Sequence, residues 1–293
     1  MKLAIHLNDF AWPVPPGDLG HLLTEIGRTA EAAGFEIVAV MDHVWQHPYA
    51  GDPTEPVLEA YSTLTWLAAA TERAGLLALA TPVSYRAPGM LAKTVTTLDV
   101  LSGGRAWLGV GVGDYEAEAR GLGIPYPSSA ERYELLEETV QICLLMWSGK
   151  RGDDQPFDGR MVQLERTLNL PQSLTRPHPP IMIAGSGAKK TLPLVARYAD
   201  ACNLRPGPDL PQTLDLLRSL CETEGRDYDA ILKTCPWRFD VGKQGENAPA
   251  LIEQLRGFAE MGIDIVVGRV VDDYRITPIE LMGREVIPAV AKL

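Results

Sequence analysis

The sequence predicts a (β/α)8 barrel of the TIM type, and three observations lead to this prediction. Short apolar runs alternate about eight times with segments of helical periodicity, which is the pattern of a parallel sheet covered by helices. The chain has 293 residues, a length typical of one such barrel. Polar or glycine-rich residues follow several of the apolar runs, at the strand ends where barrels place their functional groups.

The expected strands are short runs rich in valine, isoleucine and leucine. In chain order they cover residues 3–7, 37–40, 76–81, 106–110, 181–184, 200–203, 233–241 and 263–267. The second of these runs contains no polar residue, which is typical of a strand buried on both faces.

The expected helices have apolar residues three or four positions apart. They cover residues 18–33, 56–73, 88–102, 128–147, 188–198, 210–224, 249–261 and 278–291. Asp18 is a suitable N-cap for the first helix, and Gly34 suits the left-handed residue that ends it. Ser128 and Glu131 have the spacing of a capping box at the start of the fourth helix.

Residues 149–180 interrupt the alternation of strands and helices. This segment follows the helix after the fourth strand and is rich in Asp, Gly, Arg and Pro. Within it, Phe157-Asp158-Gly159-Arg160 predicts a tight turn between two extended pieces. The segment has too few apolar residues for a core of its own, so we expect an excursion on a single domain that spans residues 1–293.

An open doubly wound sheet is the alternative architecture for an alternating α/β chain. It would be favoured by a G-x-G-x-x-G turn after the first strand and by an acidic residue placed to bind a ribose. The sequence has neither feature, so the closed barrel is preferred.

The composition is that of an ordinary globular protein, with 46% hydrophobic and 22% charged residues. The net charge is −11 without a basic block, which argues against nucleic acid or an anionic membrane surface as a partner. No signal-peptide pattern follows Met1, and no apolar run approaches the roughly 20 residues of a membrane helix. The four cysteines form no C-x-x-C pair, so we expect reduced thiols in a cytoplasmic protein.

A polar cluster that contains Asp42, His43, Trp45 and Gln46 directly follows the second strand. The pKa of an imidazole lies near neutrality, so His43 is suited to proton transfer. Asp42 is placed to fix the tautomer of His43 or to hydrogen-bond a cofactor. The alternative is that both residues only cap a strand end. The remaining histidines show no metal-ligand spacing, and the sequence predicts no metal site.

Four motifs together resemble one family. They are M-D-H-V-W-Q at 41–46, T-P-V-S-Y-R-A-P at 81–88, L-D-V-L-S-G-G-R and G-V-G-V-G within 98–113, and R-P-H-P-P-I and G-S-G within 176–187. With these motifs in this order, the chain resembles the bacterial-luciferase-like oxidoreductases, and within them the branch that uses the deazaflavin coenzyme F420. The resemblance implies a TIM-like barrel with the cofactor across its C-terminal mouth, and a homodimer as the usual assembly.

The resemblance also implies roles for individual residues. The catalytic candidates are His43, which matches a histidine close to the reactive ring in related F420 enzymes, together with Asp42 and Asp114. Asp114 stands where related sugar-phosphate dehydrogenases carry a glutamate as proton donor, and its side chain is shorter. A non-proline cis peptide is implied at the bulge that ends the third strand, where it would join Pro82 to Val83 and press against the cofactor ring.

Two glycine-rich loops are candidate contacts for the cofactor. Gly111-Val112-Gly113 follows the fourth strand, and Gly185-Ser186-Gly187 leads into a helix that carries Lys189 and Lys190 near its start. Glycines let backbone amides approach a ligand, and a helix N-terminus attracts a phosphate. The alternative for both loops is an ordinary βα turn.

Four aromatic residues near strand ends, Trp12, Trp45, Tyr85 and Trp237, are candidates for the wall of a substrate pocket. Aromatic residues at such positions also serve as core or lid packing. Trp45 is the strongest candidate because it belongs to the same polar cluster as His43.

The sequence therefore predicts an F420-dependent oxidoreductase that transfers a hydride between the deazaflavin ring and an organic substrate. The alternative enzyme is an FMN-dependent monooxygenase, which would need a separate flavin reductase. A third alternative is a degenerate barrel that binds a flavin without catalysis. That barrel would lack the polar residues that face the ring, yet Asp42 and His43 are present.

Overall fold

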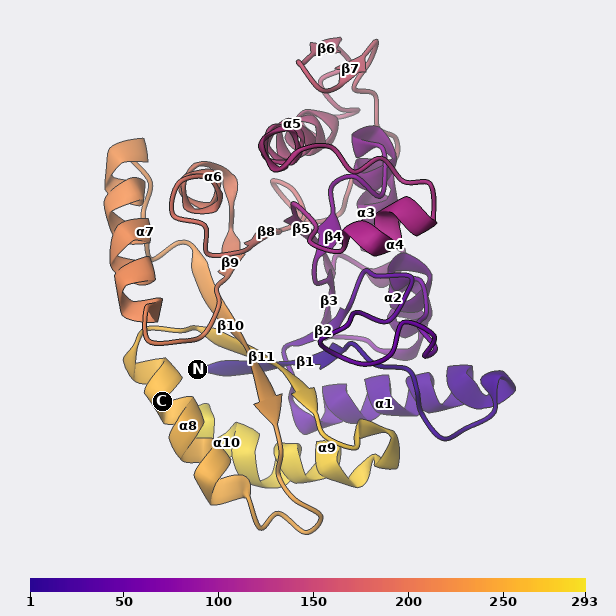
Figure 1. Cartoon of the computed structure of the whole chain (residues 1–293), viewed down its shortest axis with the longest axis vertical. Coiled ribbons are helices and arrows are strands. Elements are labelled where there is room, and N and C mark those ends of the chain that lie inside the picture. The colour runs from indigo at the N-terminus through magenta and orange to yellow at the C-terminus, as the bar shows by residue number, and fades with distance from the viewer.

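The computed structural model describes residues 1–293, and its strands form a closed barrel with helices around it (Figure 1). The strand order is β3-β2-β1-β11-β10-β9-β8-β5-β4, and a further pairing of β3 with β5 closes the ring. Because β3 and β4 follow one another along β5, they form one interrupted strand of an eight-stranded parallel barrel. The predicted (β/α)8 fold is confirmed.

The barrel strands are all parallel to their neighbours. They are β1 (Lys2–Leu7), β2 (Ile37–Val40), β3 (Gly75–Ala78), β4 (Thr81–Pro82), β5 (Ala106–Gly111), β8 (Ile181–Ala184), β9 (Ala201–Asn203), β10 (Leu232–Phe239) and β11 (Ile265–Val270).

The α-helices surround the barrel, and one short helix lies at its C-terminal mouth. They are α1 (Leu19–Ala33), α2 (Ala60–Ala70), α3 (Pro88–Ser102), α4 (Glu116–Gly121), α5 (Ser129–Trp147), α6 (Thr191–Tyr198), α7 (Leu210–Glu224), α8 (Ala248–Glu260), α9 (Thr277–Leu281) and α10 (Ile287–Val290). Shorter turns are the 3-10 helices η1 (Pro16–Asp18) and η2 (Asp273–Arg275) and the π-helical η3 (Met282–Val286). No helix combines the length and hydrophobicity that crossing a bilayer requires.

The predicted helix ends are mostly confirmed by their caps. Gly34 adopts a φ of 98° after α1, which explains why a glycine stands there. Ser128 and Glu131 form both hydrogen bonds of the capping box before α5. Asp18 does not cap α1 with its side chain, because it belongs to η1. The predicted helix at 56–73 begins only at Ala60, where the Glu59 carboxylate accepts two backbone N–H groups.

Apolar side chains fill two layers. A large layer lies between the barrel and its helices, and a smaller cluster fills the barrel interior, because successive side chains of a strand point to opposite faces. The interior cluster comprises Ala4, Ile37, Ala39, Leu77, Leu79, Met182, Ala201, Ile265 and Val267.

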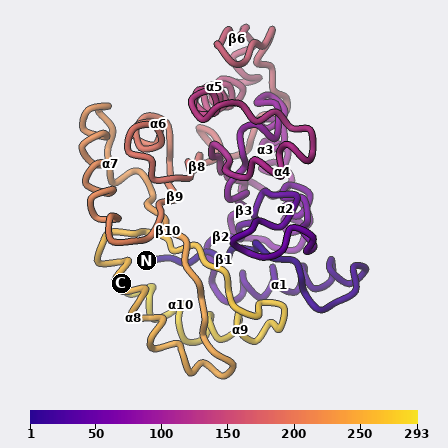
Figure 2. Tube along the Cα trace, viewed as in Figure 1, coloured from indigo at the N-terminus to yellow at the C-terminus, as the bar shows by residue number.

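The excursion at 149–180 carries a two-stranded hairpin of β6 (Phe157–Asp158) and β7 (Gln163–Leu164), which projects at one end of the trace in Figure 2. Its turn follows Asp158, two residues later than the sequence predicts. The reason is Glu138 of α5, a buried carboxylate that accepts hydrogen bonds from the backbone N–H groups of residues 160–162.

Candidate functional site at the barrel mouth

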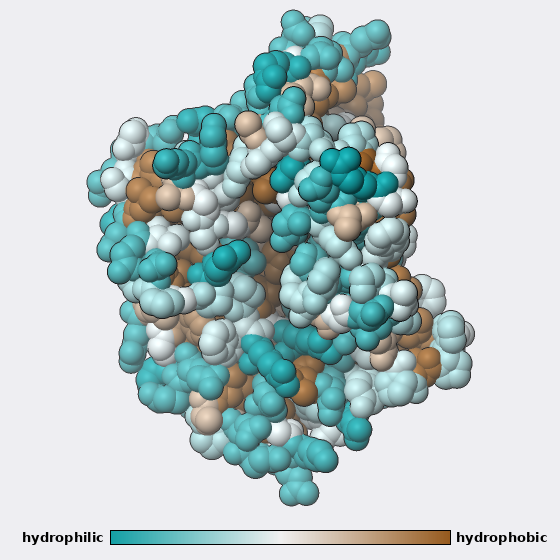
Figure 3. Space-filling view, viewed as in Figure 1, coloured by the Kyte–Doolittle hydropathy of each residue, from teal (hydrophilic) through white to brown (hydrophobic).

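Polar side chains stand above the apolar interior at the C-terminal ends of the strands. His6 on β1 lies two positions beyond Ala4 of the interior cluster, and Arg269 on β11 lies two positions beyond Val267. Alternation along a strand therefore directs both side chains toward the barrel axis. In Figure 3 the middle of the molecule is hollowed, and hydrophobic side chains line the depth of this hollow.

His43 and Glu118 form a buried pair at this mouth. His43 Nδ1 lies 2.7 Å from Glu118 Oε2, and the relative exposures of the two side chains are 10% and 0%. An ionised carboxylate can only accept, so Nδ1 carries a proton, and in the neutral imidazole Nε2 then holds the free lone pair. The structure thus gives His43 a fixed tautomer, supplied by Glu118 rather than by Asp42.

Glu118 is held ionised by four donors. Burial alone would raise its pKa, but hydrogen bonds from His43, Tyr85 and the Trp45 backbone together lower the pKa below its usual value. The Val44 N–H donates to the same oxygen as the Trp45 N–H, at 2.6 Å. Burial and the Glu118 carboxylate raise the pKa of Tyr85, which stays a neutral donor.

The sequence predictions did not include Glu118 or the helix α4 that carries it. This helix has six residues and no side-chain cap, so its pattern in the sequence is weak. The signal that could have found it is a glutamate one turn beyond Asp114, on a segment that follows the fourth strand.

Asp42 is fully buried and engaged by other side chains. Arg86 Nη1 donates to Asp42 Oδ2 at 2.6 Å, Arg86 Nη2 donates to Oδ1 at 3.0 Å, and Thr81 donates to Oδ2 at 2.7 Å. Arg86 also pairs with Glu59 and lies over the ring of Tyr61. This network joins the ends of β2 and β4 to α2 and fixes the backbone that precedes His43.

We expect Arg86→Met to lower the free energy of unfolding by about 3 kcal/mol, because it leaves the buried Asp42 carboxylate without its cation. Urea denaturation measures the change. The double variant Asp42→Asn/Arg86→Met is the matched control and should recover part of the loss. A decrease below about 1 kcal/mol in the single variant would contradict this account of Asp42.

The family resemblance implied a non-proline cis peptide at Pro82–Val83, and this position is wrong: the bond lies at Leu79–Ala80. Register explains the position. From Leu77 to Thr81 the chain advances four residues, while its partner advances three, from Trp107 to Val110. The extra residue forms a bulge between β3 and β4, so the irregular backbone comes before Thr81. Pro82 and Val83 already pair regularly with Gly111.

Small side chains leave space beside this bulge. A Cβ added to Gly111 would meet only Ala184 and Ala80, at 3.8–3.9 Å, which is ordinary van der Waals contact. Gly113 adopts a φ of 74°, and a Cβ there would stand 3.0 Å from Pro82. Val112 is half-buried. Ala80, Gly111 and Ala184 therefore form a shallow cradle that a flat ring could occupy.

The loop Gly185-Ser186-Gly187 does not open directly into a helix. Residues 187–190 form a turn in which the Lys190 N–H donates to the Gly187 carbonyl at 3.4 Å, and α6 begins only at Thr191. Lys189 and Lys190 thus precede the helix instead of lying inside it. Gly185 adopts a φ of 123°, and the Ser186 hydroxyl accepts a hydrogen bond from the Arg205 N–H.

Asp114 lies at the edge of the mouth. Its side chain is 77% exposed, and Oδ1 is 3.7 Å from His47 Nε2. Burial and the neighbouring His43 lower the pKa of His47. Ligand atoms of His43, His47 and Asp114 lie within 4.8 Å of one another, a grouping that spacing in the sequence did not indicate because two loops contribute to it.

The aromatic candidates divide into two groups. Tyr85 contacts Glu118, and Trp45 packs on α4, where a Cβ on Gly121 would clash with its ring. Trp12 is buried near the mouth and donates to Asp273 at 3.0 Å. Trp237 lies outside the barrel, because it packs on Phe258 and bonds Gln254, both on α8. The prediction of a pocket role for Trp237 is therefore wrong.

Two residues of the L-D-V-L-S-G-G-R motif have structural roles far from the mouth. Asp99 accepts hydrogen bonds from the backbone of Leu174 and Thr175, which anchors the end of the excursion to α3. Arg105 donates to the carbonyls of Ala68, Thr71 and Ala74 and so caps the end of α2.

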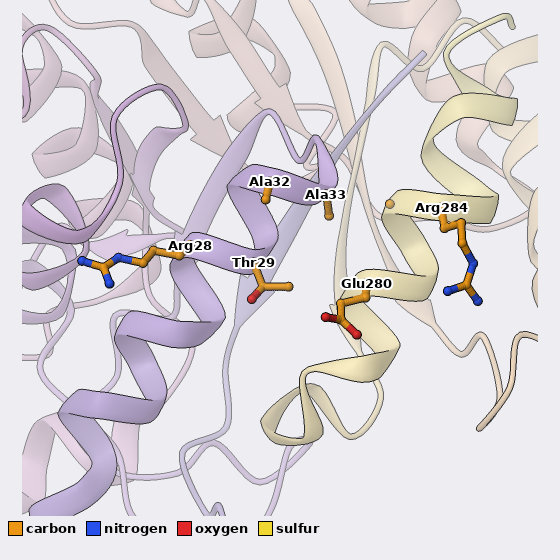
Figure 4. A pocket seen from close by; sticks show the side chains of 7 residues that line it. Arg28, Thr29, Ala32, Ala33, Glu280 and Arg284 are labelled. Atoms are coloured by element: carbon orange, nitrogen blue, oxygen red, sulfur yellow. The ribbon is translucent and has the colours of Figure 1, made fainter.

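A groove of about 470 Å³ lies between α1 and the segment of α9 and η3, on the outside of the barrel. Figure 4 shows Thr29 and Glu280 facing each other across it, while Arg28 and Arg284 point away. The polar residues of the mouth are not among those that line it, so we do not assign the chemistry to this groove.

His6 makes stability sensitive to acid. Burial lowers its pKa from 6.5 to about 4, so as pH falls through this range the unfolded chain takes up a proton that the folded chain does not. We expect the free energy of unfolding to fall between pH 6.5 and 4 by on the order of 3 kcal/mol from this residue alone. Denaturation at several pH values tests this, and His6→Gln should show a flatter dependence.

Comparisons with known proteins agree with this architecture. A model of the luciferase-like monooxygenase family matches residues 7–269. The F420-dependent glucose-6-phosphate dehydrogenase of Beutenbergia cavernae is 34% identical over 203 residues, which are 66% of this chain and 55% of that enzyme. The matched region is thus little more than half of that relative.

Two solved structures share the fold. An F420-dependent secondary alcohol dehydrogenase in complex with an F420–acetone adduct has a TM-score of 0.80 and 20% identity, with 99% of each chain covered. A riboflavin lyase with modified FMN and riboflavin has a TM-score of 0.81 and 14% identity, with 99% of this chain and 91% of that chain covered. Since the family model spans most of the sequence, the chain belongs to the luciferase-like monooxygenase family.

Proposed function

We propose that the protein is an F420-dependent oxidoreductase that acts on an organic substrate of the alcohol–carbonyl class. The observation that carries the proposal is the His43–Glu118 pair, which gives a buried imidazole a fixed tautomer at the mouth of the barrel. The Beutenbergia cavernae relative is an F420-dependent dehydrogenase by name, which supports both F420 as the cofactor and the oxidation of an alcohol group as the reaction.

The residues at the mouth fit a flat, polar cofactor. The cradle of Ala80, Gly111 and Ala184 offers space for a ring beside the bulge. Buried polar atoms without partners, His6 Nε2, Asn8 Oδ1 and Ser84 Oγ, belong to strand ends or loops of the mouth and are suited to the edges of a bound ring or substrate. The Gly185-Ser186-Gly187 loop would hold the phosphate end of the cofactor, with Lys189 and Lys190 nearby in the chain and Arg205 held next to it by the hydrogen bond of its N–H to Ser186.

The deazaflavin, when bound, supplies a ring carbon that accepts or donates a hydride. His43 Nε2 handles the proton: it takes the hydroxyl proton when an alcohol is oxidised and returns it when a carbonyl is reduced. Glu118 stabilises the imidazolium that forms, because its carboxylate already accepts the hydrogen bond from Nδ1. Asp42 and Arg86 fix the backbone next to His43. A direct proton-transfer role for Asp114 stays a prediction.

Fluorescence titration with F420 and with FMN tests the cofactor. We expect F420 to bind more tightly than FMN, and we expect the loaded protein to reduce F420 with an alcohol. Micromolar binding of FMN without any binding of F420 would instead support an FMN-dependent monooxygenase, which would require a separate reductase.

Gly111→Leu should weaken F420 binding by more than tenfold while the thermal midpoint changes little. The added side chain would fill the cradle, whereas its Cβ meets nothing closer than 3.8 Å, and Gly111 does not need a positive φ. Gly257→Val, on the surface of α8 with nothing within 4 Å of an added Cβ, is the matched control. Unchanged F420 affinity in a folded Gly111→Leu variant would show that the cofactor ring does not bind in this cradle.

We also propose a homodimer. Met90 and Leu101 on α3, and Leu170 and Leu174 beside it, are 55–63% exposed. Lys93 on α3 donates to the Leu170 carbonyl, and Asp99 binds the Leu174 N–H, so these apolar side chains gather around one helix. Light scattering on the purified protein measures the assembly. A cytoplasmic location is part of the same proposal.

A further inference from the structure

His6 has a hydrogen-bond acceptor that no protein group uses. Its Nε2 atom is buried and has no partner. The Leu79 backbone, next to the bulge, lies beside the ring, and both Arg269 and His43 are near enough for their charges to lower the pKa of His6. His6 therefore lies between the barrel interior and the residues of the proposed active site.

The protonation state of His6 is fixed by its surroundings. Burial lowers the pKa of its imidazole to about 4, so the ring is neutral near pH 7. A neutral imidazole carries one proton, and its other nitrogen is an acceptor. Because Nε2 is buried without a partner in the protein, we expect the proton on Nδ1, which leaves Nε2 free to accept a hydrogen bond.

Asn8 provides a second acceptor from the same part of the chain. Its Oδ1 is also buried without a partner. Asn8 directly follows β1, two residues after His6, and residues two apart on an extended chain share a face. Buried polar atoms are nearly always hydrogen-bonded in native proteins, so a pair of free acceptors at one mouth indicates that a ligand completes them.

We infer that His6 is a positioning residue whose Nε2 accepts a hydrogen bond from the ligand bound at the mouth, with Asn8 Oδ1 as a second acceptor. This inference rests on the proposed function, because that function brings a ligand to the mouth.

The ligand must present an O–H or N–H group at this point. A hydroxyl of the substrate other than the reacting one does so, because His43 Nε2 takes the proton of the reacting hydroxyl. The N–H in the pyrimidine part of a deazaflavin ring does so too. A ketone oxygen does not, because it would face a lone pair. If the donor is the substrate, His6 therefore favours substrates that carry a second hydroxyl.

Two substitutions at His6 separate the acceptor from the packing. His6→Phe keeps a ring of similar size without the acceptor, and His6→Gln places an amide oxygen near the position of Nε2. The affinity for F420 is measured by fluorescence titration. The KM is measured in F420 reduction with whichever of 1,2-propanediol and glucose 6-phosphate the parent protein oxidises faster, because each carries a hydroxyl besides the reacting one.

The two possible sources of the donor give different results. If the cofactor ring donates, His6→Phe weakens F420 binding about tenfold. If the substrate donates, F420 affinity is unchanged and the KM for the alcohol rises about tenfold. In both cases His6→Gln restores most of the loss, which a purely structural role would not predict. His6→Phe with parental F420 affinity and parental KM would overturn the inference.

Nitrogen NMR of protein labelled with ¹⁵N-histidine tests the tautomer directly, and the His6→Gln variant assigns the signal. We expect an unprotonated Nε2 in the free protein that shifts toward a hydrogen-bonded value when F420, or F420 with the alcohol, is added. A proton on Nε2 in the free protein would contradict the inference about His6 and leave the proposed function unaffected. A parent protein that binds no F420 would defeat the proposed function first, so the two failures are distinguishable.

Discussion

Replacing His43 with alanine is expected to lower turnover by on the order of 10²-fold or more, the usual scale for a positioned acid or base. The imidazole is buried, its Nδ1 is committed to Glu118, and its Nε2 is the atom left to exchange a proton with the substrate. The affinity for F420 should fall less than turnover, because ring contacts supply only part of cofactor binding. Steady-state kinetics and F420 titration on the same variant measure both effects.

The control is His21→Ala, which removes an exposed histidine on α1 and should leave both quantities unchanged. A structural role for His43 predicts the opposite result from a catalytic one: a lower melting temperature with turnover per folded molecule preserved. Near-parental turnover in the folded, F420-loaded His43→Ala variant would remove His43 from the chemistry.

The barrel fold could be predicted from the sequence because the patterns that specify its strands and helices are local and recur along the chain. Apolar runs such as Ile37–Val40, and caps such as Gly34 and the Ser128–Glu131 box, act within a few residues of the structure that they specify. The end of β2 was identified as the site for the same reason, since polar residues directly follow a fully buried strand. Such signals locate strand ends but do not say which side chains meet there.

Three features of the site depend on contacts between distant parts of the chain. Glu118 reaches His43 across 75 residues, and Asp42 is bound by Arg86, 44 residues away. The bulge at Leu79–Ala80 depends on the register between β3, β4 and β5, which periodicity within one strand cannot reveal. The family resemblance led to Asp114, whereas the carboxylate that bonds His43 belongs to Glu118, four residues later in the chain.

Glu118→Gln is expected to lower turnover about as much as His43→Ala, on the order of 10²-fold, although it changes one oxygen to nitrogen. Glutamine can still accept the N–H groups of Val44 and Trp45, so the fold should persist. Its NH2 group, however, would face His43 Nδ1 and the Tyr85 hydroxyl. His43 Nδ1 must then accept a hydrogen bond, which moves the ring proton to Nε2 and removes the lone pair that the proton transfer needs.

The double variant His43→Ala/Glu118→Gln distinguishes this mechanism from a general loss of structure. If Glu118 acts through His43, turnover in the double variant should equal that of His43→Ala. The reason is that His43→Ala has already removed the ring through which Glu118 affects turnover. Tyr85→Phe is the matched control, since it removes another donor to Glu118 and leaves the carboxylate facing His43. Losses that add in the double variant, on a logarithmic scale, would mean that Glu118 serves the site by a route other than the His43 tautomer.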